Sequence, residues 1–137
     1  MTDRIPTPIM LISHDGLAAA MVRASAMIMG EQENIGVVGL EEGDGLSNFI
    51  GKVQDNIADL KDAGQGIIFL VDIPFGTPWN ASVAVKREID HIVAGVSLPF
   101  FLEVLNYRNQ YNEIEKILTD SLSCKDQCFC YLGSLKR

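Results

Sequence analysis

The segment Ile67–Val71 reads Ile-Ile-Phe-Leu-Val, an unbroken apolar run with a glycine before it and an aspartate after it. A strand with one face in water alternates apolar and polar side chains, so an unbroken run predicts a strand that is covered on both faces. Similar short runs occur at Pro8–Ser13, Asn34–Leu40 and His91–Gly95. Helical patterns alternate with them, at Gly16–Met29, Leu46–Leu60, Thr77–Arg87, Ser97–Asn106 and Tyr111–Ser123. This alternation predicts an α/β fold of three layers, α/β/α, with a mostly parallel central sheet.

The C-terminal segment Gln127–Gly133 has a different pattern. Cys128, Cys130 and Leu132 alternate with other residues, which is typical of a strand with one apolar face. A short terminal strand must pair with a sheet edge to satisfy its backbone groups. We therefore expect a terminal edge strand, and in a homodimer the edge that it pairs with belongs to the other subunit.

Charge and length limit the classes of function. The 137 residues include 11 Lys and Arg against 18 Asp and Glu, which gives a net charge of −7. This charge argues against binding to nucleic acid or to anionic membranes, both of which need clustered cations. The length is typical of one domain, residues 1–137. Because the apolar runs are too short to span a membrane and the start has no export-signal pattern, we expect a cytoplasmic protein.

Two residues with reactive side chains stand where predicted strands end. His14 directly follows the first strand, and Asp72 ends the third. In a parallel sheet the working site lies at the carboxyl ends of the strands. If these strands are neighbours, the carboxylate can accept one ring N–H and leave the other nitrogen free to attack a phosphoryl group. A histidine that only packs or caps, and an aspartate that only caps a helix, are the alternative interpretations.

The predicted helix start after Asp72 adds three candidates for binding phosphoryl oxygens: Gly76, Thr77 and Asn80. Backbone amides and a hydroxyl at a helix start suit this task. Thr77 followed by Pro78 is also a common helix cap. We expect the single tryptophan, Trp79, to pack near the site or to line a docking surface.

Other chemistries lack the residue patterns that they need. Ser13 and His14 are neighbours in a strand and point in opposite directions, so they do not make a serine-hydrolase pair. The chain has neither a Gly-x-Ser-x-Gly elbow nor a G-x-x-x-x-G-K-[ST] loop. A receiver-like domain would need an acidic pair after its first strand to hold magnesium. Cys124, Cys128 and Cys130 form a poor zinc pattern, so we expect reduced thiols, no metal and no cofactor.

Four stretches of the chain form a recognisable series. They are Leu-Ile-Ser-His-Asp-Gly-Leu-Ala from Leu11, Ile-Met-Gly-Glu-Gln-Glu-Asn-Ile from Ile28, Phe-Leu-Val-Asp-Ile-Pro-Phe-Gly-Thr-Pro-Trp-Asn-Ala-Ser from Phe69, and Ala-Gly-Val-Ser-Leu-Pro-Phe-Phe-Leu-Glu from Ala94. In this order, and over residues 9–105, the chain resembles the mannose-family IIA domains of the bacterial sugar phosphotransferase system.

The resemblance implies a phosphocarrier. In that family the histidine after the first strand takes a phosphoryl group from phospho-HPr and passes it to a IIB domain, which phosphorylates sugar entering through the membrane subunits IIC and IID. His14 matches this histidine, and Asp72 matches the aspartate that hydrogen-bonds it. Thr77 stands where the family usually has serine, while Pro78 and Asn80 match directly. The family is generally dimeric, with the last strand contributed across the interface.

The chain departs from the family pattern at two places. Asp15 follows the histidine where glycine is usual, and Pro74 and Phe75 stand before Gly76 in a turn that usually reads aromatic-Gly-Gly. These changes leave an alternative, a catalytically weak regulatory module of the same fold that acts through partner binding. Since aspartate is a strong N-cap residue, we expect Asp15 to cap the helix that follows it, and Asp44 to cap the next one.

Overall fold

The computed structural model describes residues 4–135. Its sheet consists of β1 (Ile9–His14), β2 (Ile35–Leu40), β3 (Ile68–Val71) and β4 (His91–Ala94). All paired strands are parallel, and their order is β2-β1-β3-β4. The predicted α/β class is thereby confirmed, and the first and third strands are neighbours. The carboxyl ends of the strands consequently meet at one edge of the sheet.

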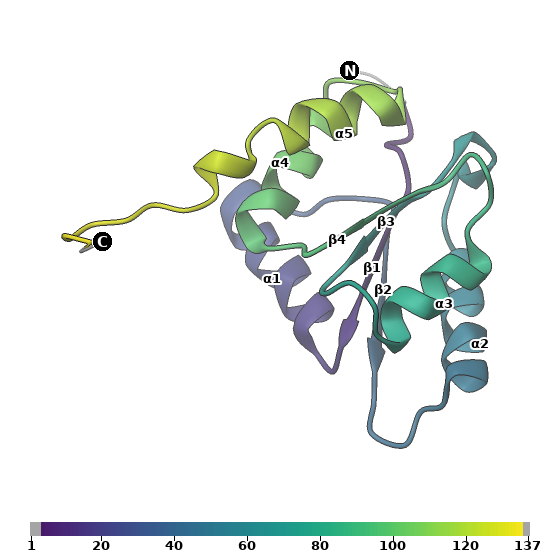
Figure 1. The fold of residues 1–137 in the computed structure, drawn as a ribbon. Helices are drawn as coiled ribbons and strands as arrows, with labels where there is room; N and C mark the ends of the chain where they lie inside the picture. The colour runs from purple at the N-terminus through teal and green to yellow at the C-terminus, as the bar shows by residue number, and fades with distance from the viewer. Residues whose placement is uncertain (1–3, 136–137) are drawn as a thin grey trace.

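Within the described residues, five helices cover the sheet in two layers (Figure 1). They are α1 (Leu17–Met29), α2 (Leu46–Ile57), α3 (Thr77–Val85), α4 (Leu98–Arg108) and α5 (Ile114–Leu122), with short 3-10 turns at Ala63–Gln65 and Lys125–Gln127. Helices α1, α4 and α5 lie on one face of the sheet, and α2 and α3 lie on the other. Because α1 to α4 each follow a strand, all four begin at the carboxyl edge.

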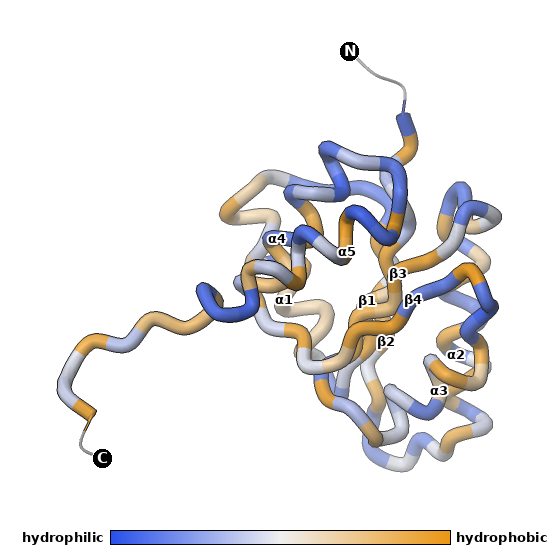
Figure 2. Tube along the Cα trace, turned by 45° about the horizontal axis from the view of Figure 1, so that its top comes forward, coloured by the Kyte–Doolittle hydropathy of each residue, from blue (hydrophilic) through white to orange (hydrophobic). Residues whose placement is uncertain are grey.

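The central strands are buried on both faces, as their unbroken apolar runs predict. In β1 the exposed fraction is 0% from Ile9 to Ile12. Neighbouring strand residues point to opposite faces, so Ile9 and Leu11 belong to the core under α1 and α4, while Met10 and Ile12 belong to the core under α2. Figure 2 shows the strands as an apolar centre among segments of mixed hydropathy.

The helix ends differ from the prediction in detail. The expected cap at Asp44 is wrong, since the N-cap of α2 is Gly45 and makes no side-chain cap bond. The Asp44 carboxylate instead accepts the Glu41 amide at 3.0 Å and pairs with Lys52 Nζ at 2.9 Å. These two contacts lower the pKa of Asp44. Helix α3 also ends earlier than predicted, at Val85.

The terminal strand predicted at Gln127–Gly133 does not form in this chain. A 3-10 turn ends at Gln127, and residues 128–135 are neither helix nor strand. Figure 1 shows this segment running away from the body of the molecule. Phe129 is 88% exposed and Leu132 is 99% exposed. Alternating side chains alone do not make a strand, because its backbone groups also need a neighbouring strand to bond to.

Candidate active site

The carboxyl edge of the sheet brings His14 and Asp72 together. His14 is the last residue of β1, and Asp72 follows β3, which pairs with β1 up to Val71. His14 Nδ1 lies 2.8 Å from Asp72 Oδ2. The His14 backbone amide donates to the same oxygen at 2.9 Å. The aspartate therefore fixes both the backbone and the ring of the histidine.

The contacts of Asp72 define the state of the imidazole. Its Oδ1 accepts the Ile73 amide at 2.9 Å, and its Oδ2 accepts the His14 amide, so both oxygens act as acceptors. An accepting carboxylate places the ring proton on His14 Nδ1 and leaves the lone pair of Nε2 free. The Asp72 side chain is 7% exposed and the His14 side chain 46%. The ring is thus held from the protein side and can be reached from solvent.

Gly76 lies against the imidazole on the Nε2 side. A Cβ built on Gly76 would be 3.5 Å from His14 Cε1 and 3.8 Å from Nε2. Gly76 is the N-cap of α3, and the first bond of that helix runs from Asn80 N to Gly76 O at 2.8 Å. The amides of Thr77 and Trp79 precede this bond and have no partner within the helix. The start of α3 therefore offers N–H groups next to the nucleophilic nitrogen.

The predicted role of Thr77 as the cap of α3 is wrong. Gly76 takes that position, and no side chain caps the helix. Thr77 is the first residue of α3, where its hydroxyl is not used as a cap. Asn80 is exposed one turn further along the same helix. The structure thus brings Gly76 to the imidazole and places Thr77 and Asn80 on the adjoining helix turn.

The prediction that Asp15 caps α1 is also wrong. The N-cap is Gly16, and it makes no side-chain cap bond. Ser13 Oγ accepts the Ala18 amide at 2.8 Å instead, from a buried position in β1. Sequence reasoning missed this contact of Ser13. Its signal is a hydroxyl residue at the end of a strand, shortly before a helix start.

Asp15 adopts a left-handed backbone, with φ of 48°. Its amide donates to Leu40 O at 2.8 Å, which ties the turn after β1 to the end of β2. Its carbonyl faces Gly39, where a Cβ would lie 2.0 Å from Asp15 O. Gly39 therefore allows the tight turn that follows His14, and a glycine inside a strand is the sequence signal of such a close approach.

Phe75 is a second residue near the histidine with a left-handed backbone, with φ of 64°. Its ring meets that of Trp79 edge to face, at a centroid distance of 5.7 Å. Trp79 therefore packs against the turn that leads into α3. Asp15 and Phe75 both stand where the family pattern has glycine, and both keep the backbone conformation that glycine favours.

Other kinds of site have less support. Among residues 4–135 no three His, Cys, Asp or Glu side chains are grouped to hold a metal ion. No helix within the described part of the chain is long and apolar enough to cross a membrane. His91 begins β4, so it lies at the amino edge of the sheet, opposite His14.

The fold and the site define a parallel α/β protein that presents a histidine, oriented by an aspartate, at the carboxyl edge of its sheet. The chain matches the family described as the PTS system fructose IIA component over residues 8–121. It is 31% identical over 124 residues to the PTS system fructose-specific EIIA component of Bacillus subtilis, covering 88% of this chain and 83% of that relative. The chain therefore belongs to the mannose, fructose and sorbose family of phosphotransferase-system IIA components.

Two further comparisons agree with this assignment. The PTS system mannose-specific EIIAB component of Escherichia coli is 30% identical over 112 residues, which is 80% of this chain. The chain spans only 34% of the length of that relative. The mannose/sorbose specific IIA subunit of the phosphotransferase system from Enterococcus faecalis has the same fold, with a TM-score of 0.77 at 22% identity over 97% of this chain and 99% of that one.

Proposed function

We propose that this IIA component is a phosphocarrier in bacterial sugar uptake, working in the cytoplasm. His14 accepts a phosphoryl group from phospho-HPr and passes it to a IIB domain, which serves the membrane subunits IIC and IID. The observation that carries the proposal is the 2.8 Å contact between His14 Nδ1 and Asp72 Oδ2. It keeps the proton on Nδ1 and leaves the lone pair of Nε2 to form a bond to phosphorus.

The transfer step depends on the positions of the reacting atoms and on stabilisation of the charges that develop, and it needs no further reagent. Nε2 attacks the phosphorus in line with its bond to the donor. As the new N–P bond forms, the old bond breaks and its electron pair stays with the donor. The positive charge that the ring acquires is stabilised by the Asp72 carboxylate. Amides at the start of α3, the Thr77 hydroxyl and the Asn80 side chain bind the phosphoryl oxygens, and the scheme uses no metal or cofactor.

Phosphorylation of the purified chain tests this proposal. The chain is incubated with enzyme I, HPr and labelled phosphoenolpyruvate, and the label is then followed in acid. Phosphohistidine is labile in acid, so we expect the label to be lost there. His14→Ala should carry no label, whereas His91→Ala, which changes the only other histidine, should be labelled like the wild type. Label that persists in His14→Ala contradicts the assignment. A wild-type chain that takes no label supports the regulatory module instead.

We further infer that the chain works as a homodimer. β4 is an edge strand, and a groove of about 200 Å³ beside it is lined by apolar side chains that include Val93, Phe100 and Leu122. The exposed apolar segment at residues 128–135 has no strand partner among residues 4–135. Pairing with an edge of a second copy would satisfy its backbone and cover its apolar side chains.

Sedimentation equilibrium at micromolar concentration tests the dimer. We expect a species of twice the 15.0 kDa chain mass, and a monomer once the segment from Cys128 onward is deleted. A wild-type chain that sediments as a monomer contradicts the dimer and leaves the phosphocarrier role untouched.

A further inference from the structure

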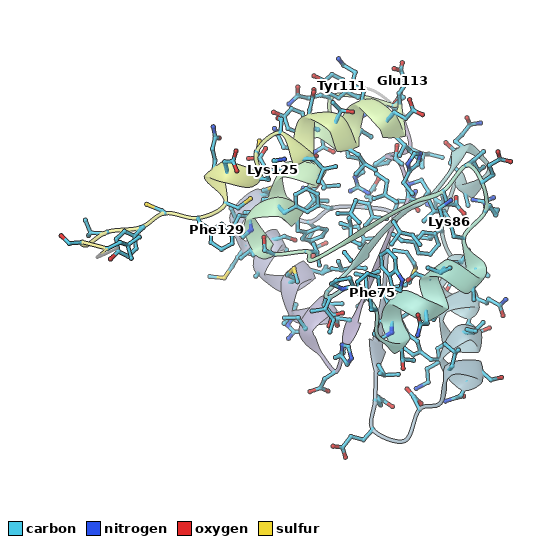
Figure 3. The ribbon with its side chains drawn as sticks, in the orientation of Figure 1. Phe75, Lys86, Tyr111, Glu113, Lys125 and Phe129 are labelled. Carbon is cyan, nitrogen blue, oxygen red and sulfur yellow. The ribbon has the colours of Figure 1, made fainter. Side chains whose placement is uncertain are left out.

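Two large apolar side chains are exposed in the turn between β3 and α3. The exposed fraction is 51% for Ile73 and 81% for Phe75, and Figure 3 labels Phe75 at this turn. The next residue, Gly76, lies against the imidazole, since its Cβ would be 3.5 Å from His14 Cε1. A protein whose phosphoryl group reaches His14 must therefore lie against this turn.

The fold itself gains little from Phe75. Its φ of 64° is a conformation that glycine or asparagine adopts readily and that a bulky side chain rarely adopts. The ring remains largely in solvent although it contacts Trp79 edge to face. A residue that strains its backbone while exposing an apolar ring indicates contact with another molecule.

The charges around this turn indicate what that molecule is. The loops that follow the four strands contain no lysine or arginine and five carboxylates, those of Asp15, Glu41, Glu42, Asp44 and Asp72. Two lysines reach this edge from outside these loops, so the carboxylates still outnumber them. The Lys52 ammonium is paired with Asp44 at 2.9 Å and with Glu41 at 3.4 Å, and Lys125 lines a groove with Gly95 and Ser97 after β4. The edge is therefore negative around an exposed aromatic ring. Its complement is a protein surface with basic residues around an apolar patch.

We infer that Phe75, Ile73 and Trp79 form the docking surface for the protein that delivers the phosphoryl group to His14. That protein presents an apolar patch bordered by lysine and arginine, and the inference rests on the proposed phosphocarrier function. Aromatic side chains carry much of the binding energy at protein interfaces, because they bury a large area at a small cost in conformational entropy. Phe75 is more exposed than Ile73, so we expect recognition to depend more on Phe75.

Phosphorylation assays of Phe75 variants, each carried out with two different phosphoryl donors, test the inference. Phe75→Asn removes the ring and keeps a side chain that tolerates the left-handed backbone, whereas Phe75→Tyr keeps an aromatic ring. Met27→Gln is the matched control, because Met27 is 91% exposed near the far end of α1. The initial rate of phosphorylation is measured against the concentration of phospho-HPr, and separately with phosphoramidate, a donor too small to use a docking surface.

We expect Phe75→Asn to raise the KM for phospho-HPr about tenfold while kcat changes less than twofold, since loss of one interface anchor commonly costs this much affinity. Phe75→Tyr should restore most of the wild-type KM, and Met27→Gln should match the wild type with both donors. The KM for phospho-HPr should also rise with added salt, because exposed charges are screened. The phosphoramidate rate should not follow either change.

Three results would overturn the inference. An unchanged KM in Phe75→Asn means that the ring is not part of the docking surface. An equal loss with both donors means that the ring acts on the imidazole and not on docking. If neither donor phosphorylates His14 in the wild-type chain, the phosphocarrier proposal fails and the docking surface fails with it. Labelling of His14 by phosphoramidate separates the first two results from the third.

Discussion

Gly39→Ala is the sharpest test of the backbone that holds His14. The new Cβ would lie 2.0 Å from the Asp15 carbonyl oxygen and 3.0 Å from its carbon. Both groups belong to the backbone, so no side-chain rotation removes the clash, and β1 and β2 must separate by more than about 1 Å to reach an ordinary contact distance.

The expected cost follows from the contacts that this movement breaks. Backbone displacement in a well-packed region costs roughly 1–3 kcal/mol. Loss of the hydrogen bond from Asp15 N to Leu40 O, now 2.8 Å long, adds about 1 kcal/mol. Replacing glycine in a strand returns roughly 0.5–1 kcal/mol of chain entropy. The free energy of unfolding should therefore fall by about 1–3.5 kcal/mol.

Urea unfolding followed by circular dichroism measures this change, with Gly51→Ala as the matched control. Gly51 lies inside α2, where an added Cβ meets nothing within 4 Å. There the same substitution should stabilise the chain, by up to about 1 kcal/mol. Gly39→Ala should also slow phosphorylation, because the displaced turn directly follows His14. If Gly39→Ala is as stable as the wild type, the close approach of Asp15 to β2 does not exist in solution and the reasoning fails.

Three further predictions concern single side chains. Asp72→Asn should slow phosphorylation at least tenfold with the fold intact, because an amide no longer enforces the required ring tautomer; an unchanged rate would contradict this role. Thr77→Val should slow transfer about tenfold if its hydroxyl bonds the phosphoryl oxygens, and Thr77→Ser should not. Burial alone would raise the pKa of Asp90, but hydrogen bonds from Arg87 and from the Ile67 amide outweigh it and lower the pKa below its usual value of 3.8. The folded state then binds fewer protons, so this contribution is present above pH 3.8 and is lost as the pH falls through the lowered pKa; acid unfolding of Asp90→Asn, monitored by circular dichroism, should lack it.

The parallel sheet and the edge at which the site lies follow from local patterns. The unbroken run at Ile67–Val71 requires cover on both faces, and parallel strands joined by helices meet at one carboxyl edge. Asp72 is the first polar residue after the run Ile67–Val71. His14 comes directly after Ser13, the buried polar residue that ends the first run. Their place at one edge of the sheet could therefore be predicted, whereas their contact also required β1 and β3 to be neighbours, which the structure shows.

The turn next to His14 could not be predicted, because it depends on contacts between distant segments. By residue type Asp15 is a strong helix cap. Its conformation is set instead by the bond from its amide to Leu40 and by the space that Gly39 leaves for its carbonyl. The cap bond goes to Ser13, which is the residue that β1 holds in reach of α1. Tertiary contacts thus overrode a local preference.

The C-terminal segment shows a second reason why sequence-based prediction fails: a local pattern is present, but the structure that it predicts does not form. Cys128, Cys130 and Leu132 have the alternation of a strand, yet residues 128–135 form none in this chain. Side-chain alternation reports which face could be covered, whereas a strand exists only where another backbone accepts its hydrogen bonds. The sequence of the segment does not specify this neighbouring backbone. Whether residues 128–135 form a strand therefore depends on the surface that lies beside them.

Asp15 and Phe75, the two residues with a left-handed backbone near His14, allow effects on stability to be distinguished from effects on function. Asp15 has φ of 48° and Phe75 has φ of 64°. Glycine removes a penalty of roughly 1–2 kcal/mol at such a position and costs roughly 0.5–1 kcal/mol in chain entropy. Each replacement should therefore stabilise the chain by at most about 1.5 kcal/mol. The two residues lie in different loops. The gain in stability of the double variant should therefore equal the sum of the gains in Asp15→Gly and Phe75→Gly, unless the two loops are coupled through contacts with His14. Phosphorylation by phospho-HPr should weaken strongly in the two variants that lack the Phe75 ring, and only slightly in Asp15→Gly, which removes one of the five carboxylates at this edge. Thermal unfolding of the three variants measures the change in stability, and their phosphorylation by phospho-HPr measures the effect on docking. A chain stabilised by both replacements and still phosphorylated at the wild-type KM would show that neither side chain is kept for contact with a partner.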